Sequence, residues 1–173
     1  MMELEIILFD KTLKPSEKPG LLSKILLENP QQVNELVMLA LKARDADKGN
    51  CIEAIEHATL SNPGMATSEC FDLVVESLTA RAPRVKWESA RVIANVAGQF
   101  QGRLHEAVPN LLANTEDPGT VVRWSAATAL ASIVKLKTPL NKTLIPALES
   151  LAEKEEKISI RKIYLDGIKK AGK

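Results

Sequence analysis

The sequence has 173 residues, of which 45% are hydrophobic and only 3% are aromatic, so its core must be built from aliphatic side chains and alanine. Such side chains suit closely packed helices better than a sheet, and the length fits one domain with a substantial core. The 23 basic and 22 acidic residues leave a net charge of +1, which excludes a global field that would attract nucleic acid or an anionic membrane.

Residues 1–29 are expected to close one end of the molecule. Leucine and isoleucine within residues 1–13 have helical spacing, although residues 3–6 also alternate like a strand, and we prefer a short capping helix. Residues 14–20 contain two prolines and indicate a linker. The apolar residues 21–28 then predict a short helix, which we interpret as an incomplete first repeat.

The clearest helical pair lies at residues 104–137. Apolar residues follow the i, i+3, i+4, i+7 pattern over 104–114, and Pro118 in the polar turn that follows lacks a backbone donor. A second amphipathic helix is predicted over 120–134. Such a pair cannot bury both of its apolar faces alone, so it needs neighbours of the same kind.

Six further helices flank this pair, and a proline or a capping side chain marks the start of five of them. A capping side chain accepts hydrogen bonds from the free N–H groups of the first turn, and proline lacks an N–H that the first turn does not need. We expect helices from Asn29-Pro30 to about residue 43, from Asp47 to about residue 60, from Thr67 or Ser68 to about residue 78, from Pro83 to about Gly98, from Thr138-Pro139 to about residue 152, and over 158–171.

A short pattern recurs along the chain at a spacing of about 35 to 38 residues, which is typical of a helical-pair solenoid. The Val-Lys-Trp segment that ends at Trp87 matches the Val-Arg-Trp segment that ends at Trp124, and Ile-Arg-Lys follows at Lys162. We therefore divide the chain into a cap with a partial repeat and one continuous domain of four repeats. The predicted ranges are 1–29 for the cap, 30–173 for the domain, and 30–62, 64–99, 101–137 and 139–173 for its repeats.

Over roughly residues 30–171 the sequence resembles HEAT-repeat proteins. The resemblance rests on a proline within the first helix of a repeat (Pro109, Pro146), an acidic turn, and a Val-Arg pair that opens an alanine-rich second helix. It implies an all-α fold: a right-handed, armadillo-like α-solenoid of about four helical pairs with an N-terminal helical cap. The family name specifies a scaffold and no single activity.

The resemblance also implies a ladder of charged side chains along the turns. In HEAT repeats, an acid in the turn and an arginine six residues later contact each other along the stack. Asp117 with Arg123 and Glu155 with Arg161 match both positions, and Lys86 should lie in the same row. The two N-terminal repeats depart from the pattern at one position each, with Ala80 in place of the acid and Cys51 in place of the arginine.

The sequence contains no pattern that indicates catalysis. We find no nucleophile elbow, phosphate-binding loop or metal-ligand spacing, so we expect neither an enzyme nor a bound cofactor or metal. His57 and His105 lie far apart and are interpreted as surface or partly packed side chains. Cys51 and Cys70 are expected to be free thiols, with a disulfide as the less favoured alternative.

Two tryptophans mark the candidate binding surface. Trp87 and Trp124 occupy equivalent places in adjacent second helices, and the resemblance implies that second helices line the concave side. Large rings on a rigid concave surface are usual anchors of binding, whereas the alternative is that both rings pack between repeats. The predicted partner-binding residues are Trp87, Arg91, Trp124, Thr128, Lys162 and Asp166.

Two functions are compatible with the sequence. We favour a non-enzymatic scaffold that binds a protein or peptide in its concave groove. The alternative is nucleic-acid binding, because DNA-alkylation-repair glycosylases share a HEAT-like fold and the basic residues Lys86, Arg91, Arg123, Arg161 and Lys162 would suit phosphates. Acidic residues, Glu56 and Asp166, interrupt that surface. No apolar run is long enough to span a bilayer and no secretory signal is evident, so we expect a cytoplasmic protein.

Overall fold

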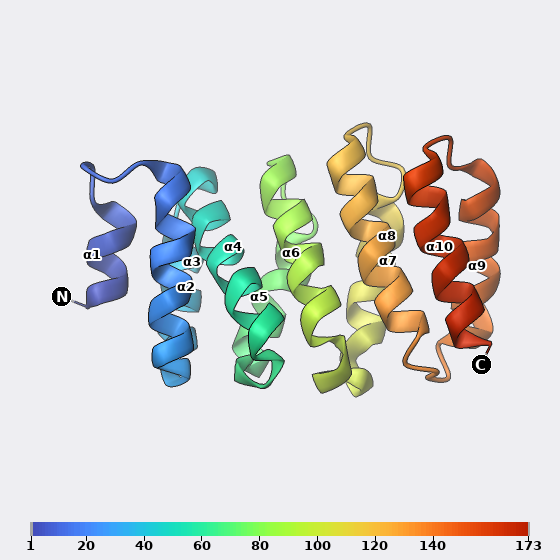
Figure 1. Ribbon diagram of the computed structural model, residues 1–173, viewed down its shortest axis with the longest axis horizontal. Helices are drawn as coiled ribbons and strands as arrows, with labels where there is room; N and C mark the ends of the chain where they lie inside the picture. Colours follow the sequence, from blue (N-terminus) through green and yellow to red (C-terminus); the bar gives the residue numbers. More distant parts are fainter. Residues whose placement is uncertain (1, 173) are drawn as a thin grey trace.

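A computed structural model describes residues 2–172, and within that range the chain forms α-helices and short 3₁₀ turns without a strand (Figure 1). This confirms the expected all-α fold. The helices are α1 (Glu3–Phe9), α2 (Lys18–Glu28), α3 (Val33–Lys42), α4 (Asp45–Ser61), α5 (Ser68–Ser77), α6 (Pro83–Val96), α7 (Leu104–Asn114), α8 (Thr120–Val134), α9 (Asn141–Lys154) and α10 (Ile158–Ala171).

The helices stack as two parallel rows. The even-numbered helices α2, α4, α6, α8 and α10 form one row, in which each helix packs extensively on the next, and this row lies in front in Figure 1. The odd-numbered helices α3, α5, α7 and α9 lie behind, each against its even-numbered partner. We call the outer surface of the even-numbered row the second-helix face. The arrangement is a solenoid, because each helical pair contacts mainly its neighbours.

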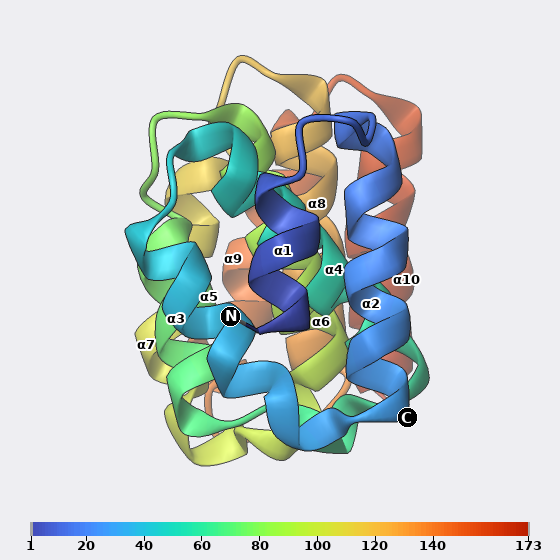
Figure 2. The ribbon, with the colours of Figure 1, turned by 90° about the vertical axis from the view of Figure 1, so that its left-hand side faces the viewer.

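Helix α1 closes the N-terminal end of the stack, as the sequence predicts. It packs against both α2 and α3 and covers the end that an additional repeat would otherwise occupy (Figure 2). Leu4 and Leu8 point inward and are fully buried. The ammonium group of Lys18 donates a hydrogen bond of 2.7 Å to the carbonyl oxygen of Leu8, which satisfies one of the free acceptors at the end of α1.

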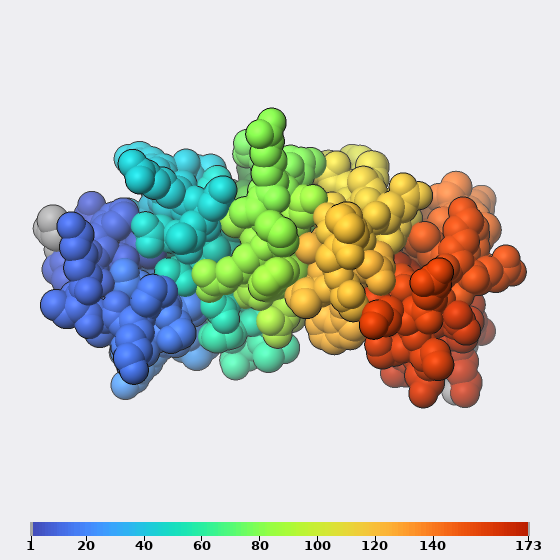
Figure 3. Space-filling view, turned by 90° about the horizontal axis from the view of Figure 1, so that it is seen from above, coloured from blue at the N-terminus to red at the C-terminus, as the bar shows by residue number. Residues whose placement is uncertain are grey.

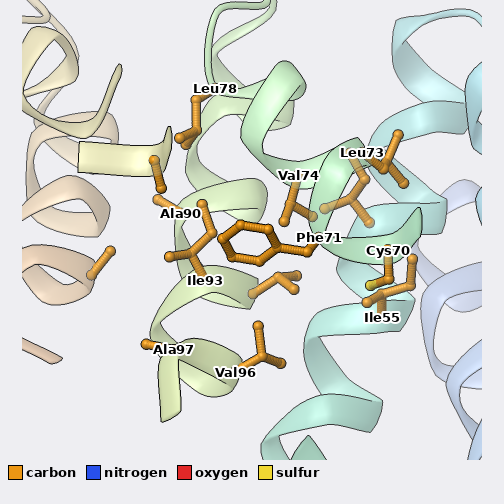
Figure 4. Close-up of a cluster of buried hydrophobic side chains, with 14 of the residues drawn as sticks. Ile55, Cys70, Phe71, Leu73, Val74, Leu78, Ala90, Ile93, Val96 and Ala97 are labelled. Atoms are coloured by element: carbon orange, nitrogen blue, oxygen red, sulfur yellow. The ribbon is translucent and has the colours of Figure 1, made fainter. Parts of the chain in front are cut away.

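Aliphatic side chains from both rows fill the core, which also contains Phe71, with the partly buried Phe100 packed against it. Phe71 of α5 points toward α6, with Ile93 beside its ring and Val96 further along the same helix (Figure 4). Phe100 stacks on Phe71 with ring centroids 4.5 Å apart, an offset arrangement that favours aromatic pairs. The guanidinium group of Arg103 lies over the ring of Phe71, 4.8 Å from the ring centroid. Two of the six aromatic residues of the chain therefore meet between α5 and the segment that follows α6.

Small residues let α8 and α10 approach closely. Ala127 and Ala131 of α8 are buried, and Gly167 of α10 lies against this alanine surface. A Cβ atom added at Gly167 would lie 2.9 Å from the Cβ atom of Ala131, closer than normal packing allows. The alanine-rich second helix is thus explained by helix spacing, because larger side chains here would separate the repeats.

Several predicted helix starts are confirmed and three are wrong. Pro83 opens α6, and the hydroxyl oxygen of Thr67 accepts a hydrogen bond of 3.1 Å from the backbone N–H of Cys70 at the start of α5. Asn29 does not cap α3, because its side chain makes no capping bond and the helix begins at Val33, after a 3₁₀ turn at Pro30–Gln32. Asp47 does not cap α4, because that helix already begins at Asp45. Thr138 does not cap α9 either: its hydroxyl accepts from the N–H of Leu140 within a turn, and the helix begins at Asn141.

The molecule is elongated along the stacking direction. Seen from above, the even-numbered helices lie along the lower side of Figure 3, with α6 and α8 in the middle of the stack. Trp87 and Trp124 belong to these two helices. The division of the chain at residues 29, 63, 100 and 138 remains a prediction, but it separates the observed helices into α1 with α2 and four following pairs.

Candidate interaction surface

A ladder of charged side chains runs along the turns that join paired helices. Lys86 donates to the carboxylate of Asp117 at 2.9 Å, and Arg123 lies 3.2 Å from the carboxylate of Glu155. Arg123 also donates to the carbonyl oxygen of Asp117 at 3.1 Å, as Arg161 does to that of Glu155 at 2.7 Å. The two predicted pairs are in contact, but each arginine binds the backbone carbonyl of its turn acid and not the carboxylate. Each arginine holds the backbone of its own turn, and the carboxylate that Lys86 or Arg123 contacts belongs to the next turn.

The contacts of the ladder lower the pKa of its two acids, Asp117 and Glu155. Partial burial alone would raise the pKa of Asp117, but the backbone N–H of Gly119 and the ammonium group of Lys86 outweigh burial and lower that pKa. The pKa of Glu155 is lowered in the same way, because the backbone N–H of Lys157 and the guanidinium of Arg123 outweigh its burial. Both carboxylates therefore remain charged at neutral pH, which keeps the ladder intact.

The two tryptophans of the second-helix face differ in exposure. Trp124 of α8 is 40% exposed, whereas Trp87 of α6 is partly buried. No ring stacking joins the two in residues 2–172, where the stacked pair is Phe71 with Phe100. Thr128 is partly buried one turn after Trp124, and its hydroxyl donates a hydrogen bond of 2.9 Å to the carbonyl oxygen of Trp124. A ligand on this face would meet the ring of Trp124 first.

The last helix adds two exposed charges of opposite sign to this face. Lys162 and Asp166 are both exposed on α10. Asp166 lies 3.3 Å from Lys135 of α8 and 3.3 Å from Lys170, and hydrogen bonds from both lysines lower its pKa. Lys162 has no ion-pair partner in the part of the chain that the structure describes. The C-terminal half of the face thus carries Lys162 as an unpaired cation near Asp166, a charged carboxylate that already pairs with two other lysines.

A charge network that we did not predict from the sequence joins α4 to α6. Arg91 lies 3.3 Å from the carboxylate of Glu56 on α4 and 3.2 Å from that of Glu88 on its own helix. Both carboxylates are almost completely buried, and each has an oxygen without a hydrogen-bond partner among the described residues. Burial, together with the nearby charge of Glu53, raises the pKa of Glu88.

A second arginine, two turns earlier on α6, completes the network. Arg84 of α6 donates to the carboxylate of Glu53 and, at 3.0 Å, to the side-chain oxygen of Asn50, both on α4. A Cβ atom at Gly49 would lie 3.1 Å from this guanidinium, so the glycine leaves room for it. Arg84, Glu88 and Arg91 lie at helical spacing on one side of α6, which indicates a charged stripe on that helix but not its partners on α4.

Most of the basic residues proposed for phosphate binding are already engaged. Lys86, Arg91 and Arg123 contact carboxylates, and Arg161 contacts a backbone carbonyl group. A phosphate would have to displace these partners, whereas Lys162 has no ion pair in the described chain. These basic residues therefore provide little unpaired positive charge. Nucleic acid binding requires a surface rich in such charge.

The remaining candidate groups for chemistry do not form a site within residues 2–172. His57 and His105 are exposed, and no three or more histidine, cysteine or acidic side chains are placed to hold a metal ion. Cys51 and Cys70 are free and buried, and burial raises the pKa of each thiol to about 12. Each helix in that range is also too short or too polar to cross a lipid bilayer.

Comparisons with known proteins agree on the fold. No family model and no curated protein matches the sequence. A designed armadillo repeat protein in complex with the peptide (KR)4 superposes with a TM-score of 0.74 and 18% identity, over 98% of this chain and 80% of that one. An engineered protein gives a TM-score of 0.74 and 20% identity, over 96% and 80%. Computationally designed armadillo repeat proteins for modular peptide recognition give 0.70 and 19%, over 97% and 80%.

At identities of 18–20%, these similarities establish the fold and nothing further. They agree with the two rows of stacked helices and with the contacts between neighbouring pairs. The chain is therefore a helical-repeat solenoid with an armadillo-like architecture.

Proposed function

We propose that this solenoid is a non-enzymatic scaffold that binds a segment of another protein on its second-helix face. The observation that carries the proposal is the ring of Trp124, a large aromatic side chain that is 40% exposed on a helix held by neighbours on both sides. An aromatic ring on a rigid support loses little conformational entropy on binding, so it is a favourable anchor.

The face around Trp124 suits a protein segment better than a nucleic acid. The neighbouring helices of this face carry charges of both signs, with Arg91 on α6 and with Lys162 and Asp166 on α10. Alternating charge favours a partner with matched polar groups, whereas nucleic acid requires a continuous positive surface. The designed armadillo protein in complex with (KR)4 is compatible with peptide recognition by this architecture, although its sequence identity of 18% transfers no specificity.

We further propose that the repeats are of the HEAT type. A HEAT repeat has two helices and an armadillo repeat has three, and the division proposed above gives two long helices in each repeat. Pro109 lies inside α7 and Pro146 inside α9, at equivalent places in the first helices of two repeats. The charged ladder of Asp117, Arg123 and Glu155 supports the same assignment.

The experiment is quantitative capture of proteins from the source organism's lysate by immobilised wild-type chain and by Trp124→Ala, with and without nuclease. Leu60→Ala is the matched control, because Leu60 is 66% exposed at the end of α4, away from Trp124. We expect Trp124→Ala to lose a nuclease-resistant partner that Leu60→Ala retains. Equal capture by both variants would contradict the proposal, and capture that nuclease abolishes would favour nucleic acid.

A further inference from the structure

A cluster of exposed apolar side chains lies on α1 and α3, away from Trp124. Met2, Ile6 and Phe9 follow one side of α1, and Met38 and Leu41 follow the outward side of α3. Each is 50–54% exposed. The two helices pack together at the N-terminal end of the stack (Figure 2). Single exposed apolar residues are ordinary on protein surfaces, but five on two adjacent short helices indicate an interaction site.

Two grooves follow the two sides of α3. One, of about 560 Å³, lies between α1 and α3 and includes Phe9, Met38 and Leu39 in its lining. The other, of about 470 Å³, lies between α3 and α5 and includes Val37, Met38 and Leu41. Because Met38 borders both grooves, the outward side of α3 is a ridge with a groove on each side. Ridges and grooves of this kind are what another helix packs on, through apolar side chains at i, i+3, i+4 and i+7.

Acidic side chains outnumber basic ones along both grooves, most clearly in the groove between α3 and α5. Asp72 is paired with Arg103, and Glu69 accepts a hydrogen bond of 3.4 Å from Asn34. Glu5, Glu35 and Glu76 have no ion pair within residues 2–172. Oε1 of Glu35 is buried in the same range without a hydrogen-bond donor. Cations on a partner would therefore find unpaired acceptors beside an apolar surface. The charged residues that line the two grooves are Glu5, Glu35, Glu69, Asp72, Glu76 and Lys42.

From this combination we propose a second docking site, formed by α1, α3 and α5, for an amphipathic helix of a partner protein that carries lysine or arginine beside its apolar side. The apolar side chains of that helix occupy the grooves on either side of Met38, and its cations pair with Glu5, Glu35 and Glu76. An anionic membrane is disfavoured as the occupant because the same carboxylates repel it. The site is separate from Trp124, so the scaffold holds two partners at once.

The test uses the full chain and two fluorescent helical peptides of about 18 residues, roughly five helical turns. Both peptides have leucine at the i, i+3, i+4 and i+7 positions; one has lysine and the other glutamate at the remaining charged positions. Fluorescence anisotropy should give a dissociation constant for the lysine peptide at least about tenfold lower than for the glutamate peptide. Added salt should weaken binding of the lysine peptide, because its cations face partly exposed carboxylates.

Variants locate the binding surface. Met38→Ser with Leu41→Ser should weaken binding of the lysine peptide by about tenfold or more, and Glu5→Gln with Glu35→Gln should reduce its salt dependence. Leu60→Ser and Trp124→Ala are the controls and should leave binding unchanged, which separates this site from the second-helix face. All five sites of substitution on α1, α3 and α4 are partly or largely exposed, and circular dichroism verifies that each variant is folded.

Three results would overturn the proposal. The first is equal affinity for the lysine and glutamate peptides, or no binding of either. The second is loss of lysine-peptide binding in Trp124→Ala with retention in the Met38→Ser, Leu41→Ser variant. The third is a dimer mass by light scattering that the same double variant reduces to the monomer mass, because a second copy of the chain would then cover α1 and α3.

Discussion

Arg123 of α8 contacts the carboxylate of Glu155, which belongs to the following turn, while its guanidinium group also donates to the carbonyl oxygen of Asp117 in its own turn. One side chain thus ties two successive turns together. Lys86 repeats the carboxylate contact one step earlier, with Asp117 as its partner. Because each carboxylate is positioned by a backbone N–H of its turn, the ladder sets the spacing between repeats as well as neutralising charge.

Replacement of Arg123 by methionine should lower the free energy of unfolding by about 1–3 kcal/mol, because Glu155 is then left nearly buried without its cation. Urea denaturation measures the change. Lys162→Met is the matched control, since Lys162 is exposed on α10 and has no ion-pair partner in the described chain, and its effect should stay within about 0.5 kcal/mol. Equal effects of the two substitutions would refute a structural role for the ladder.

Acid should weaken the fold through Asp117 and Glu155. The folded state lowers the pKa of both carboxyl groups, so the stability they contribute is present above their unfolded pKa values and is lost as the pH falls through the folded ones. Urea midpoints should therefore decrease as the pH is lowered below about 4. Asp117→Asn should show a smaller decrease than the wild type. A wild-type midpoint that does not change in this range would contradict the assignment.

Two glycines should respond to alanine in opposite directions. Gly167→Ala places a Cβ atom against Ala131 of α8, and the resulting overlap should destabilise the chain by about 1–3 kcal/mol. Gly20 lies within α2 with nothing near its added Cβ atom, so Gly20→Ala should stabilise by about 0.5–1 kcal/mol through helix propensity. Thermal unfolding of both variants provides the measurement. Stabilisation by Gly167→Ala would show that α8 and α10 are further apart.

Cys51 and Cys70 should not react with a thiol reagent in the native protein. Both are buried, and burial raises the pKa of each to about 12, so the reactive thiolate is scarce at a mildly alkaline pH of about 8. Absorbance after addition of an aromatic disulfide reagent should show no fast reaction in buffer, whereas both thiols should react in denaturant. Rapid reaction of either cysteine without denaturant would mean that its helix opens locally.

The sequence was sufficient to predict the C-terminal half of the fold closely. Helices over 104–114, 120–134 and 158–171 begin and end as expected, because apolar periodicity is strong and Pro118 interrupts it sharply. The caps at Asp47 and Thr138 were wrong for one reason: a capping side chain can equally close a turn or occupy the first helical turn. Local sequence does not decide between these geometries.

The candidate surface was less predictable than the fold. The equivalence of Trp87 and Trp124 was visible in the repeat, yet their unequal exposure depends on how neighbouring helices cover each ring. The burial of Glu56 and Glu88 likewise follows from the packing of α4 on α6, which no spacing along one helix reveals. The exposure of Met38 and Leu41 likewise depends on which sides of α3 its neighbours cover, and the sequence alone does not give it.

The central claim is that the second-helix face around Trp124 holds a protein partner. The most direct measurement is photo-crosslinking in lysate, with a benzophenone amino acid at Lys162 on this face and, as the control, at His105 on α7 in the other row. We predict that the reagent at Lys162 forms a nuclease-resistant adduct with a protein, and that Trp124→Ala abolishes it. An adduct formed equally well from His105, or one that survives Trp124→Ala unchanged, would contradict the account.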